Sequence, residues 1–287
     1  MHFVNAKSIL SSSNGMNIFR GCVHGCIYCD SRSLCYQFTH PFEDIEVKQN
    51  APELLRHALI KKRRKCMIGT GSMCDPYIPQ ETELMLTRRC LEVIAEYDFG
   101  AAVLTKSDLI LRDLDILTQI NQRQKAVVQM TLTTADDQLC KILEPNVCPT
   151  DRRYEVLCRM RDEGIPTIVW LSPFLPYIND TKENLDALLD LCFKAQVHGI
   201  VFFGMGMTLR SGSREYYYKA LDRHFPRLKK QYEAEFGDQY EISRRSQRYL
   251  EPYFHKICEE KGILHKTEDC FQYLRELPEP FEQMSLF

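Results

Sequence analysis

The sequence predicts an α/β protein built on a parallel β-sheet. Short apolar runs alternate with longer amphipathic stretches along the 287 residues, and the apolar runs contain almost no polar positions. Strands that alternate with helices in this way pair in parallel. Strands that are hydrophobic along their whole length belong to a sheet covered on both faces, as in a barrel or a doubly wound sheet.

Five apolar runs are the predicted strands, because each is short and dominated by apolar side chains. They lie at residues 65–69 (KCMIG), 100–105 (GAAVLT), 126–132 (AVVQMTL), 166–171 (PTIVWL) and 199–203 (GIVFF). Before and between these runs, five stretches carry apolar residues at the spacing of one helix face, as Leu55 and Leu59 do in the first of them. These predicted helices cover residues 52–64, 81–97, 113–121, 153–163 and 184–196.

The chain after Arg210 has a different character. No further strand pattern follows, and charged and aromatic residues become frequent. We therefore expect a partial barrel at residues 1–210, a helical extension at 211–275 and a flexible tail at 276–287.

Composition and charge exclude several classes of protein. With 44% hydrophobic and 26% charged residues, the chain resembles a globular protein and not a disordered or collagen-like one. The 37 basic and 39 acidic residues nearly cancel, so the net charge does not support a polyanionic partner. No apolar run approaches the roughly 20 residues that span a bilayer, and the first residues lack the apolar core of a signal peptide. We expect a cytoplasmic protein without a membrane segment.

Two basic runs stand out locally, KKRRK at residues 61–65 and SRRSQR at 243–248. The first fits a solvated helix C-terminus, where cations complement the helix dipole. Either run also fits a patch that contacts phosphate groups.

Thirteen cysteines are the main anomaly of the composition. Their odd number, their scattered spacing and the missing secretion signal argue against a disulfide framework. Reduced thiols then serve as core residues, metal ligands or redox groups.

Three of these cysteines lie within eight residues, in the stretch GCVHGCIYCD at 21–30. Cys22, Cys26 and Cys29 are close enough in sequence to converge on one metal centre. Three thiolates can bind an iron-sulfur cubane and leave one iron open to a substrate or cofactor. The alternatives are a zinc site completed by His24 or Asp30, and three unrelated buried thiols.

This Cys-x3-Cys-x2-Cys spacing, with the aromatic Tyr28 before the last cysteine, resembles the radical S-adenosylmethionine (SAM) enzymes. The resemblance implies an incomplete (β/α)6 TIM-like barrel with a [4Fe-4S] cluster on Cys22, Cys26 and Cys29. It also implies that SAM binds the fourth iron and is cleaved reductively to a 5′-deoxyadenosyl radical, which abstracts a hydrogen atom. An electron donor such as flavodoxin or ferredoxin would then be a partner.

Further motifs resemble the spore photoproduct lyase-like branch of these enzymes, over about residues 15–210. They are RGCVHGCIYC at 20–29, DPYIPQE at 75–81, TKSDLILRDLDIL at 105–117, TLTTAD at 131–136 and SPFLPYIND at 172–180. The branch resemblance implies a damaged or modified nucleic acid, in particular DNA, as substrate. Two alternatives stay open: modification of a protein or small molecule by the same radical, and a non-enzymatic metal-binding scaffold associated with a sliding clamp.

The resemblance also implies contacts to SAM, at positions that follow the predicted strands. Gly71 and Ser72 match residues beside the methionine amino group, where glycine permits close approach of the backbone. Lys106 matches a lysine that holds the methionine carboxylate, Thr131 a hydroxyl residue near the ribose, and Tyr28 a contact to adenine. From the residues alone, Lys106 could be a surface lysine and Thr131 a packed strand residue.

The position of a hydrogen-donating thiol departs from the branch pattern. Spore photoproduct lyase returns a hydrogen atom from a cysteine three residues before the aspartate, and this sequence has Ser72 there. Cys74 stands directly before the aspartate and is the predicted catalytic residue. Cys140 and Cys148 are other candidates, and all three could instead be small buried hydrophobic residues.

Four charged residues near these motifs have less definite roles. Asp75 and Glu144 could bind SAM or substrate, or they could cap a loop or pair with an arginine. For Arg112 and Asp113 we expect a structural role, tying a helix start to the barrel.

The last five residues, Gln283 to Phe287 (QMSLF), resemble the short peptide by which bacterial replication and repair proteins bind the sliding clamp. A glutamine followed by an aliphatic residue and a terminal Leu-Phe can fill a shallow apolar pocket. The alternative is a disordered tail with a chance Leu-Phe.

Overall fold

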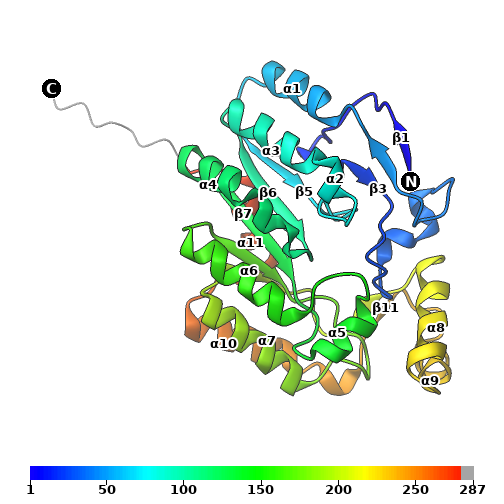
Figure 1. Cartoon of the computed structure of the whole chain (residues 1–287). Coiled ribbons are helices and arrows are strands. Elements are labelled where there is room, and N and C mark those ends of the chain that lie inside the picture. Colours follow the sequence, from blue (N-terminus) through cyan, green and yellow to red (C-terminus); the bar gives the residue numbers. More distant parts are fainter. Residues whose placement is uncertain (279–287) are drawn as a thin grey trace.

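A computed structural model describes residues 1–278 of the chain. Its centre is a sheet of six parallel strands in the order β2-β5-β6-β7-β8-β9 (Figure 1). The order of the strands across the sheet is therefore the same as their order along the chain. This singly wound order is that of an incomplete TIM-like barrel, which confirms the predicted fold class. The strands are β2 (Gly15–Met16), β5 (Met67–Thr70), β6 (Gly100–Thr105), β7 (Ala126–Thr131), β8 (Thr167–Trp170) and β9 (Gly199–Val201).

All five predicted strands are present, each within a few residues of its predicted bounds. Strand β2 was not predicted, because its two residues Gly15 and Met16 have no apolar run around them. It exists through its pairing with Gly69 and Thr70 of β5. Pairing with a neighbour can therefore create a strand that local sequence does not indicate.

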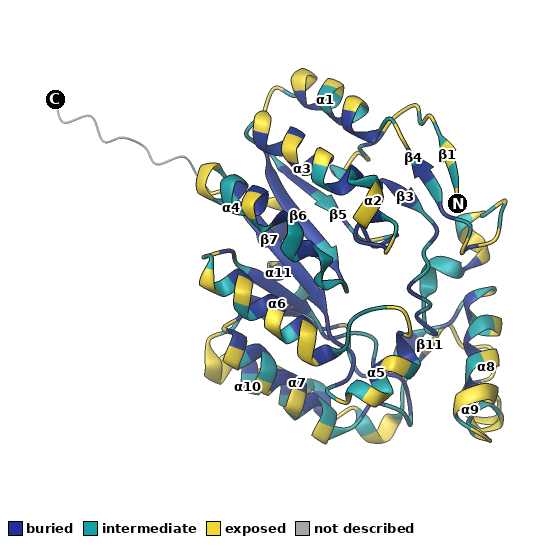
Figure 2. Cartoon of the chain, viewed as in Figure 1, coloured by how far each residue is buried: buried dark blue, intermediate teal, exposed yellow. Residues whose placement is uncertain are grey.

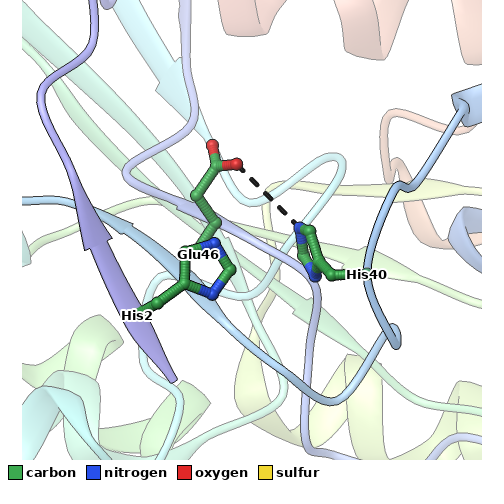
Figure 3. A group of neighbouring side chains, drawn as sticks. All are labelled: His2, His40 and Glu46. Atoms are coloured by element: carbon green, nitrogen blue, oxygen red, sulfur yellow. Dashed lines mark ion pairs between the residues drawn. The ribbon is translucent and has the colours of Figure 1, made fainter.

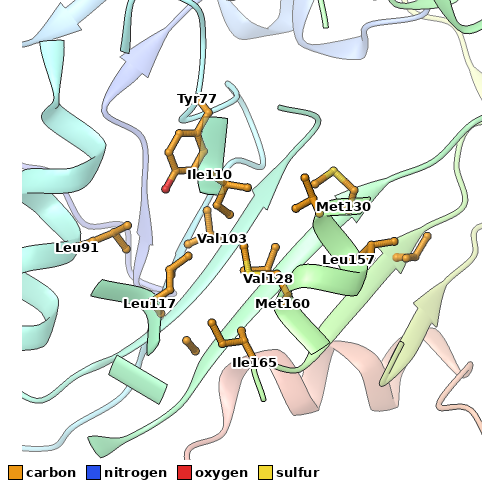
Figure 4. Packing of buried hydrophobic residues seen from close by; sticks show 14 of the residues in the cluster. Tyr77, Leu91, Val103, Ile110, Leu117, Val128, Met130, Leu157, Met160 and Ile165 are labelled. Carbon is orange, nitrogen blue, oxygen red and sulfur yellow. The ribbon is translucent and has the colours of Figure 1, made fainter. Parts of the chain in front are cut away.

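Five amphipathic helices cover the outer face of the sheet, and their buried residues face it (Figure 2). They are α1 (Ala51–Lys61), α3 (Leu86–Glu96), α4 (Leu114–Arg123), α6 (Thr150–Asp162) and α7 (Lys182–Ala195). Figure 4 shows the packing between sheet and helices, where Val103 and Val128 of the strands meet Leu117, Leu157 and Met160. This layer is the main hydrophobic core.

The single helix predicted over residues 81–97 is two helices, α2 (Glu81–Leu84) and α3, separated by Met85 in a left-handed conformation (φ 54°). The buried Glu81 carboxylate causes the break. It accepts hydrogen bonds from the backbone N–H groups of Leu86 (3.0 Å) and Thr87 (2.9 Å), and so satisfies two free donors at the start of α3.

The inner face of the sheet is covered by the C-terminal helix α11 (Thr267–Arg275), on the side opposite to α4 and α6 (Figure 1). Cys270 and Leu274 of α11 pack against strand residues such as Ala102 and Val127. This burial on both faces explains why the strands are hydrophobic along their whole length. The Lys125 ammonium donates to the carbonyls of Tyr273 (2.6 Å) and Glu276 (3.0 Å), at the C-terminal end of α11.

Smaller elements complete the fold. The region after Arg210 is not purely helical, because β11 pairs antiparallel with β10. The division of the chain at residue 210 stays a prediction, and this strand pair crosses it. No helix in the described part of the chain is long and apolar enough to cross a membrane. These elements are β1 (His2–Val4), β3 (Phe19–Arg20), β4 (Glu46–Lys48), α5 (Asp137–Leu143), β10 (Met207–Thr208), α8 (Ser213–His224), α9 (Leu228–Phe236), β11 (Glu241–Ile242) and α10 (Leu250–Lys261), with short 3-10 helices η1 (Asp30–Arg32), η2 (Leu34–Tyr36), η3 (Asp108–Asp113) and η4 (Arg245–Gln247).

Candidate active site

One large pocket, of about 720 Å³, opens where the strands end. Five consecutive strands each contribute a residue at or just after their carboxyl end, as expected for a barrel of parallel strands. These are Gly71, Lys106, Thr131, Trp170 and Phe203. All nine residues that the sequence predicted as site residues line this pocket: Cys22, Cys26, Cys29, Tyr28, Gly71, Ser72, Cys74, Lys106 and Thr131.

The loop that carries the three cysteines follows β3 and is anchored by the last residue of α5 and by the segment after it. The Ile27 N–H donates to the Leu143 carbonyl (2.9 Å), and the Asn146 backbone N–H donates to the His24 carbonyl (3.1 Å). The Asn146 side chain donates to the carbonyl of Val23 (2.8 Å). Contacts over more than 100 residues of sequence therefore turn this loop toward the pocket.

The arrangement of the three thiols fits an iron-sulfur cluster better than one zinc ion. Four ligand atoms around a zinc with Zn–S bonds of 2.3 Å lie about 3.8 Å apart. Within residues 1–278, Cys22, Cys26 and Cys29 are not among the groups whose ligand atoms all lie within 4.8 Å of one another. A wider spacing suits a cluster in which each thiolate binds its own iron.

The two candidates for a fourth zinc ligand have other partners. The Nδ1 atom of His24 lies 3.5 Å from a carboxylate oxygen of Asp75. Asp30 accepts a hydrogen bond from the Tyr36 hydroxyl (3.0 Å). These contacts orient the His24 ring and hold Asp30 beside η2.

The ionisation of the thiols differs along the loop. Burial raises the pKa of Cys26 and of Cys29. A hydrogen bond with Cys74 lowers the pKa of Cys22. Burial therefore favours the protonated thiol at Cys26 and Cys29, and each must lose that proton when it binds iron.

Gly71 is required by the close approach of two strands. It has φ 101°, and a Cβ atom at this position would lie 1.9 Å from the Leu104 carbonyl oxygen. The turn from β5 into the pocket thus leaves room for no side chain. The exposed backbone at residues 71–72 is free to contact a ligand.

Asp75 organises the same strand ends. Its carboxylate accepts hydrogen bonds from the Thr105 hydroxyl (2.7 Å) and from the backbone N–H groups of Lys106 (2.8 Å) and Tyr77 (2.9 Å). Together with His24, these partners occupy both oxygens. Of the roles considered for Asp75, the loop cap matches this geometry.

Lys106 supplies positive charge to the pocket. Its ammonium nitrogen lies 3.4 Å from the Thr131 hydroxyl and 6.0 Å from the centre of the Tyr28 ring. Burial lowers the pKa of Lys106, but Cys26 and Glu144 outweigh that effect, and the pKa is raised overall. The side chain is therefore cationic at neutral pH and is not the free surface lysine considered above.

Glu144 forms a buried ion pair with Arg153, with 2.5 Å between the charged atoms and no exposure of either side chain. Arg153 also donates to the carbonyls of Thr131 (3.0 Å) and Cys148 (2.9 Å). The Tyr28 hydroxyl donates to the same Glu144 carboxylate. Glu144 thus pairs with an arginine, one of the roles considered for it, and fixes Tyr28 against β7.

Arg112 and Asp113 have the structural role expected of them. Arg112 donates to the Glu81 carbonyl (2.8 Å) and to its carboxylate (3.0 Å). Asp113 accepts from the Tyr77 hydroxyl (3.0 Å) and from Arg88 (3.2 Å). These bonds join the starts of α3 and α4.

The candidate thiols lie in different places. Cys74 lines the pocket and donates to the Gly21 carbonyl (2.6 Å). Cys148 donates to the Lys106 carbonyl (3.2 Å), and Cys140 lies in the core; neither lines the large pocket.

The pocket lining also includes residues that the sequence did not single out. Trp170 and Phe203 meet edge to face, with ring centroids 5.7 Å apart, and 56% of Phe203 is exposed. The Trp170 N–H donates to the Gln129 side chain (2.9 Å), which fixes the indole ring. Ser243 and Glu251, from the region after residue 210, line the same pocket. The only available signal was that the chain's single tryptophan lies next to the last residue of a predicted strand.

Comparisons with known proteins agree with this picture. The family model described as the radical SAM superfamily matches residues 16–192, more than half of the chain. The chain is 28% identical over 257 residues to an uncharacterized protein of Mycobacterium tuberculosis, Rv2578c, covering 86% of this chain and 71% of that protein. It is 29% identical over 181 residues to the uncharacterized protein MJ0683 of Methanocaldococcus jannaschii, covering 62% and 67%.

Among solved structures, spore photoproduct lyase complexed with dinucleoside spore photoproduct has a similar fold. The TM-score is 0.65 at 13% identity, covering 92% of this chain and 80% of that chain. Identity this low supports likeness of fold alone. With the family model spanning more than half of the sequence, the chain belongs to the radical SAM superfamily, whose cofactors are a [4Fe-4S] cluster and S-adenosylmethionine.

Proposed function

We propose that this radical SAM enzyme acts on damaged or modified nucleic acid. When bound, the cluster and SAM supply a 5′-deoxyadenosyl radical that can abstract a hydrogen atom. The observation that carries the substrate proposal is the mixed lining of one pocket, in which the cysteine loop, here called the cofactor end, is joined by the aromatic residues Trp170 and Phe203, here called the aromatic end.

At the cofactor end, Cys22, Cys26 and Cys29 would hold the cluster. Lys106 would bind the methionine carboxylate, because it is the one lysine or arginine among the described residues that line the pocket. The remaining SAM contacts would come from Gly71 and Ser72 at the amino group, Thr131 at the ribose and Tyr28 at the adenine.

At the aromatic end, a base can stack on the exposed ring of Phe203, because every base has a π-face. Glu251 lines this end and offers an acceptor to the edge of a base. Directly beside the pocket-lining Ser243, the segment around η4 exposes Arg245, Arg248 and Tyr249. Within residues 1–278 neither arginine forms an ion pair, so both guanidinium groups are available to phosphates.

The other basic run is a natural control for this proposal. Residues 61–65 precede β5, and they therefore lie at the end of the sheet opposite to the pocket. Binding of ultraviolet-irradiated DNA, followed by fluorescence anisotropy at several salt concentrations, should weaken in the double variant of Arg245 and Arg248. The slope of the logarithm of the binding constant against the logarithm of the salt concentration should decrease in magnitude by about 2. Each phosphate that the variant no longer neutralises accounts for about 0.9 of this change. The matched double variant of Arg63 and Arg64 should keep the wild-type slope. Equal slopes in both variants would refute the proposal that Arg245 and Arg248 contact DNA phosphates.

Catalysis is tested separately from binding. Protein reconstituted anaerobically with iron and sulfide and reduced with dithionite should form 5′-deoxyadenosine, and Cys26→Ala should form none. Irradiated DNA should increase this product or be converted to repaired bases. Product formation without any response to DNA would favour a protein or small-molecule substrate. Absence of product from a protein with a full cluster would favour the non-enzymatic scaffold.

Cys74 is proposed as the hydrogen donor, since it is the only cysteine beyond the three predicted ligands that lines the pocket within the described residues. Its S–H bond would break as the product radical gains the hydrogen atom, leaving a thiyl radical that a later electron must reduce. In D2O the thiol exchanges, so the product should carry deuterium at the repaired carbon. Cys74→Ala should lose this label while still forming 5′-deoxyadenosine, and Cys148→Ala should keep it. Iron analysis of each variant checks that its cluster is intact.

Two partners stay proposals. A flavodoxin or ferredoxin would supply the electron, and replacing dithionite by such a protein tests this. The predicted clamp-binding peptide Gln283–Phe287 lies outside the described residues. A pulldown with sliding clamp should lose the protein when these residues are deleted.

A further inference from the structure

Three metal-ligating side chains meet on the small N-terminal sheet, away from the active-site pocket. His2, His40 and Glu46 each offer one ligand atom, and these atoms all lie within 4.8 Å of one another (Figure 3). It is the only such group of three among residues 1–278. The group arises from strand pairing, because His2 of β1 lies directly beside Glu46 of β4 in the parallel register.

The hydrogen bonds around the histidines prepare them for a metal. The Nδ1 atom of His2 lies 3.0 Å from a carboxylate oxygen of Asp44, and the Nδ1 atom of His40 lies 3.0 Å from the Pro41 carbonyl oxygen. Such partners fix the proton on Nδ1 and leave Nε2 as a lone-pair donor. A carboxylate or carbonyl behind the imidazole is the usual outer shell of a metal-bound histidine.

The second ring nitrogen of His40 is free to bind a metal. His40 Nε2 is buried and has no hydrogen-bond partner within the described residues. It lies 3.9 Å from a carboxylate oxygen of Glu46, which is too far for a hydrogen bond. Donors on one tetrahedral zinc lie about 3.4 Å apart, so a shift of about half an ångström brings His40 and Glu46 to that spacing.

Within residues 1–278, neither neighbouring cation forms an ion pair with Glu46. Arg20 lies beside it in the β3–β4 register, but its guanidinium donates to the carbonyls of Tyr36 (2.8 Å) and Gln37 (3.1 Å). The Lys48 ammonium donates to the Asn17 carbonyl (2.8 Å). The carboxylate is therefore left for another cation.

We infer that His2, His40 and Glu46 bind a divalent first-row transition ion of the zinc class. Two imidazoles and one carboxylate suit zinc, with a water at the fourth position. The ion would join β1 and β4 to the loop that carries His40. Strand β4 also pairs with β3, which leads into the cysteine loop. The bound ion would therefore stabilise the small sheet next to that loop. This inference does not depend on the proposed substrate.

The test uses the reconstituted holoenzyme, so that the cluster cysteines are occupied by iron. After dialysis against buffered Zn²⁺, wild type should retain one zinc per chain that Glu46→Gln and His40→Ala lack. His57→Ala, which alters an exposed histidine on α1, should retain zinc as wild type does. Glu46→Gln keeps the size of the side chain and serves as the test if His40→Ala does not fold. Equal zinc retention by all four proteins would overturn the inference.

The ligands themselves are tested by X-ray absorption at the zinc edge. The expected first shell contains only nitrogen and oxygen, at about 2.0–2.1 Å. A sulfur shell at about 2.3 Å would place the zinc on cysteines and overturn the inference. Zn²⁺ should also raise the unfolding temperature of wild type and His57→Ala, but not that of Glu46→Gln.

Discussion

Replacing Glu144 by Gln removes the charge that pairs with the buried guanidinium of Arg153 while it keeps the size of the side chain. Removing one partner of a buried ion pair costs about 3–5 kcal/mol, because the other charge is left uncompensated. Arg153 retains two backbone acceptors, the carbonyls of Thr131 and Cys148. We therefore expect a loss at the lower end of that range, about 3 kcal/mol.

Urea unfolding followed by circular dichroism measures this loss. With a slope near 3 kcal/mol per molar, the midpoint should fall by about 1 M. Glu155→Gln is the matched control, because it makes the same substitution in an exposed carboxylate that pairs with Arg152, and exposed pairs contribute little. A Glu144→Gln midpoint equal to that of Glu155→Gln would refute the reasoning.

The pH dependence of Glu144→Gln gives a second readout. Burial alone would raise the pKa of Glu144, but Arg153 and Lys106 hold it below its ordinary value. A carboxylate with a depressed folded pKa stabilises the fold above its unfolded pKa of about 4.3 and loses this contribution as the pH falls through the folded pKa. The difference between wild type and variant should therefore be constant above about pH 6 and narrow below about pH 4. A difference that does not depend on pH would assign the loss to packing.

Three further perturbations have expected outcomes. Gly71→Ala places a Cβ against the Leu104 carbonyl and should abolish SAM binding, measured by equilibrium dialysis. The control Gly164→Ala, also at positive φ but with open space around it, should bind SAM normally. Lys106→Met should weaken SAM binding at least tenfold, about 1.4 kcal/mol, if the ammonium holds the carboxylate; unchanged affinity would remove that role. Burial lowers the pKa of Lys125 to about 8, whereas in the unfolded chain it is about 10.4. Between about pH 8 and pH 10.4 the unfolded chain therefore binds more protons than the folded chain. Wild type should therefore gain stability relative to Lys125→Met as the pH rises through this range, and parallel curves in urea unfolding would contradict it.

The residues proposed for the cofactor end could be picked out from sequence, through their resemblance to family motifs, because each motif is local. The cysteine spacing, the glycine turn at Gly71 and the lysine after β6 each occupy a few residues. Parallel strands bring such motifs to one edge of the sheet. The substrate end could not be predicted in this way. Trp170, Phe203 and Glu251 come from separate segments, and only their packing brings them to one pocket.

Periodicity and spacing within short windows predict five of the six strands of the sheet, the helix faces and the cysteine loop. Only the folded structure shows the pairing that creates β2, the break at Met85, and the packing of α11 on the inner face of the sheet. Only the folded structure shows which arginine pairs with Glu144, namely Arg153, and that His40 lies close to Glu46. Apart from the break at Met85, which rests on the nearby Glu81 carboxylate, each of these depends on an interaction between residues of different elements or loops, and the free energy of that interaction exists only once the chain has folded.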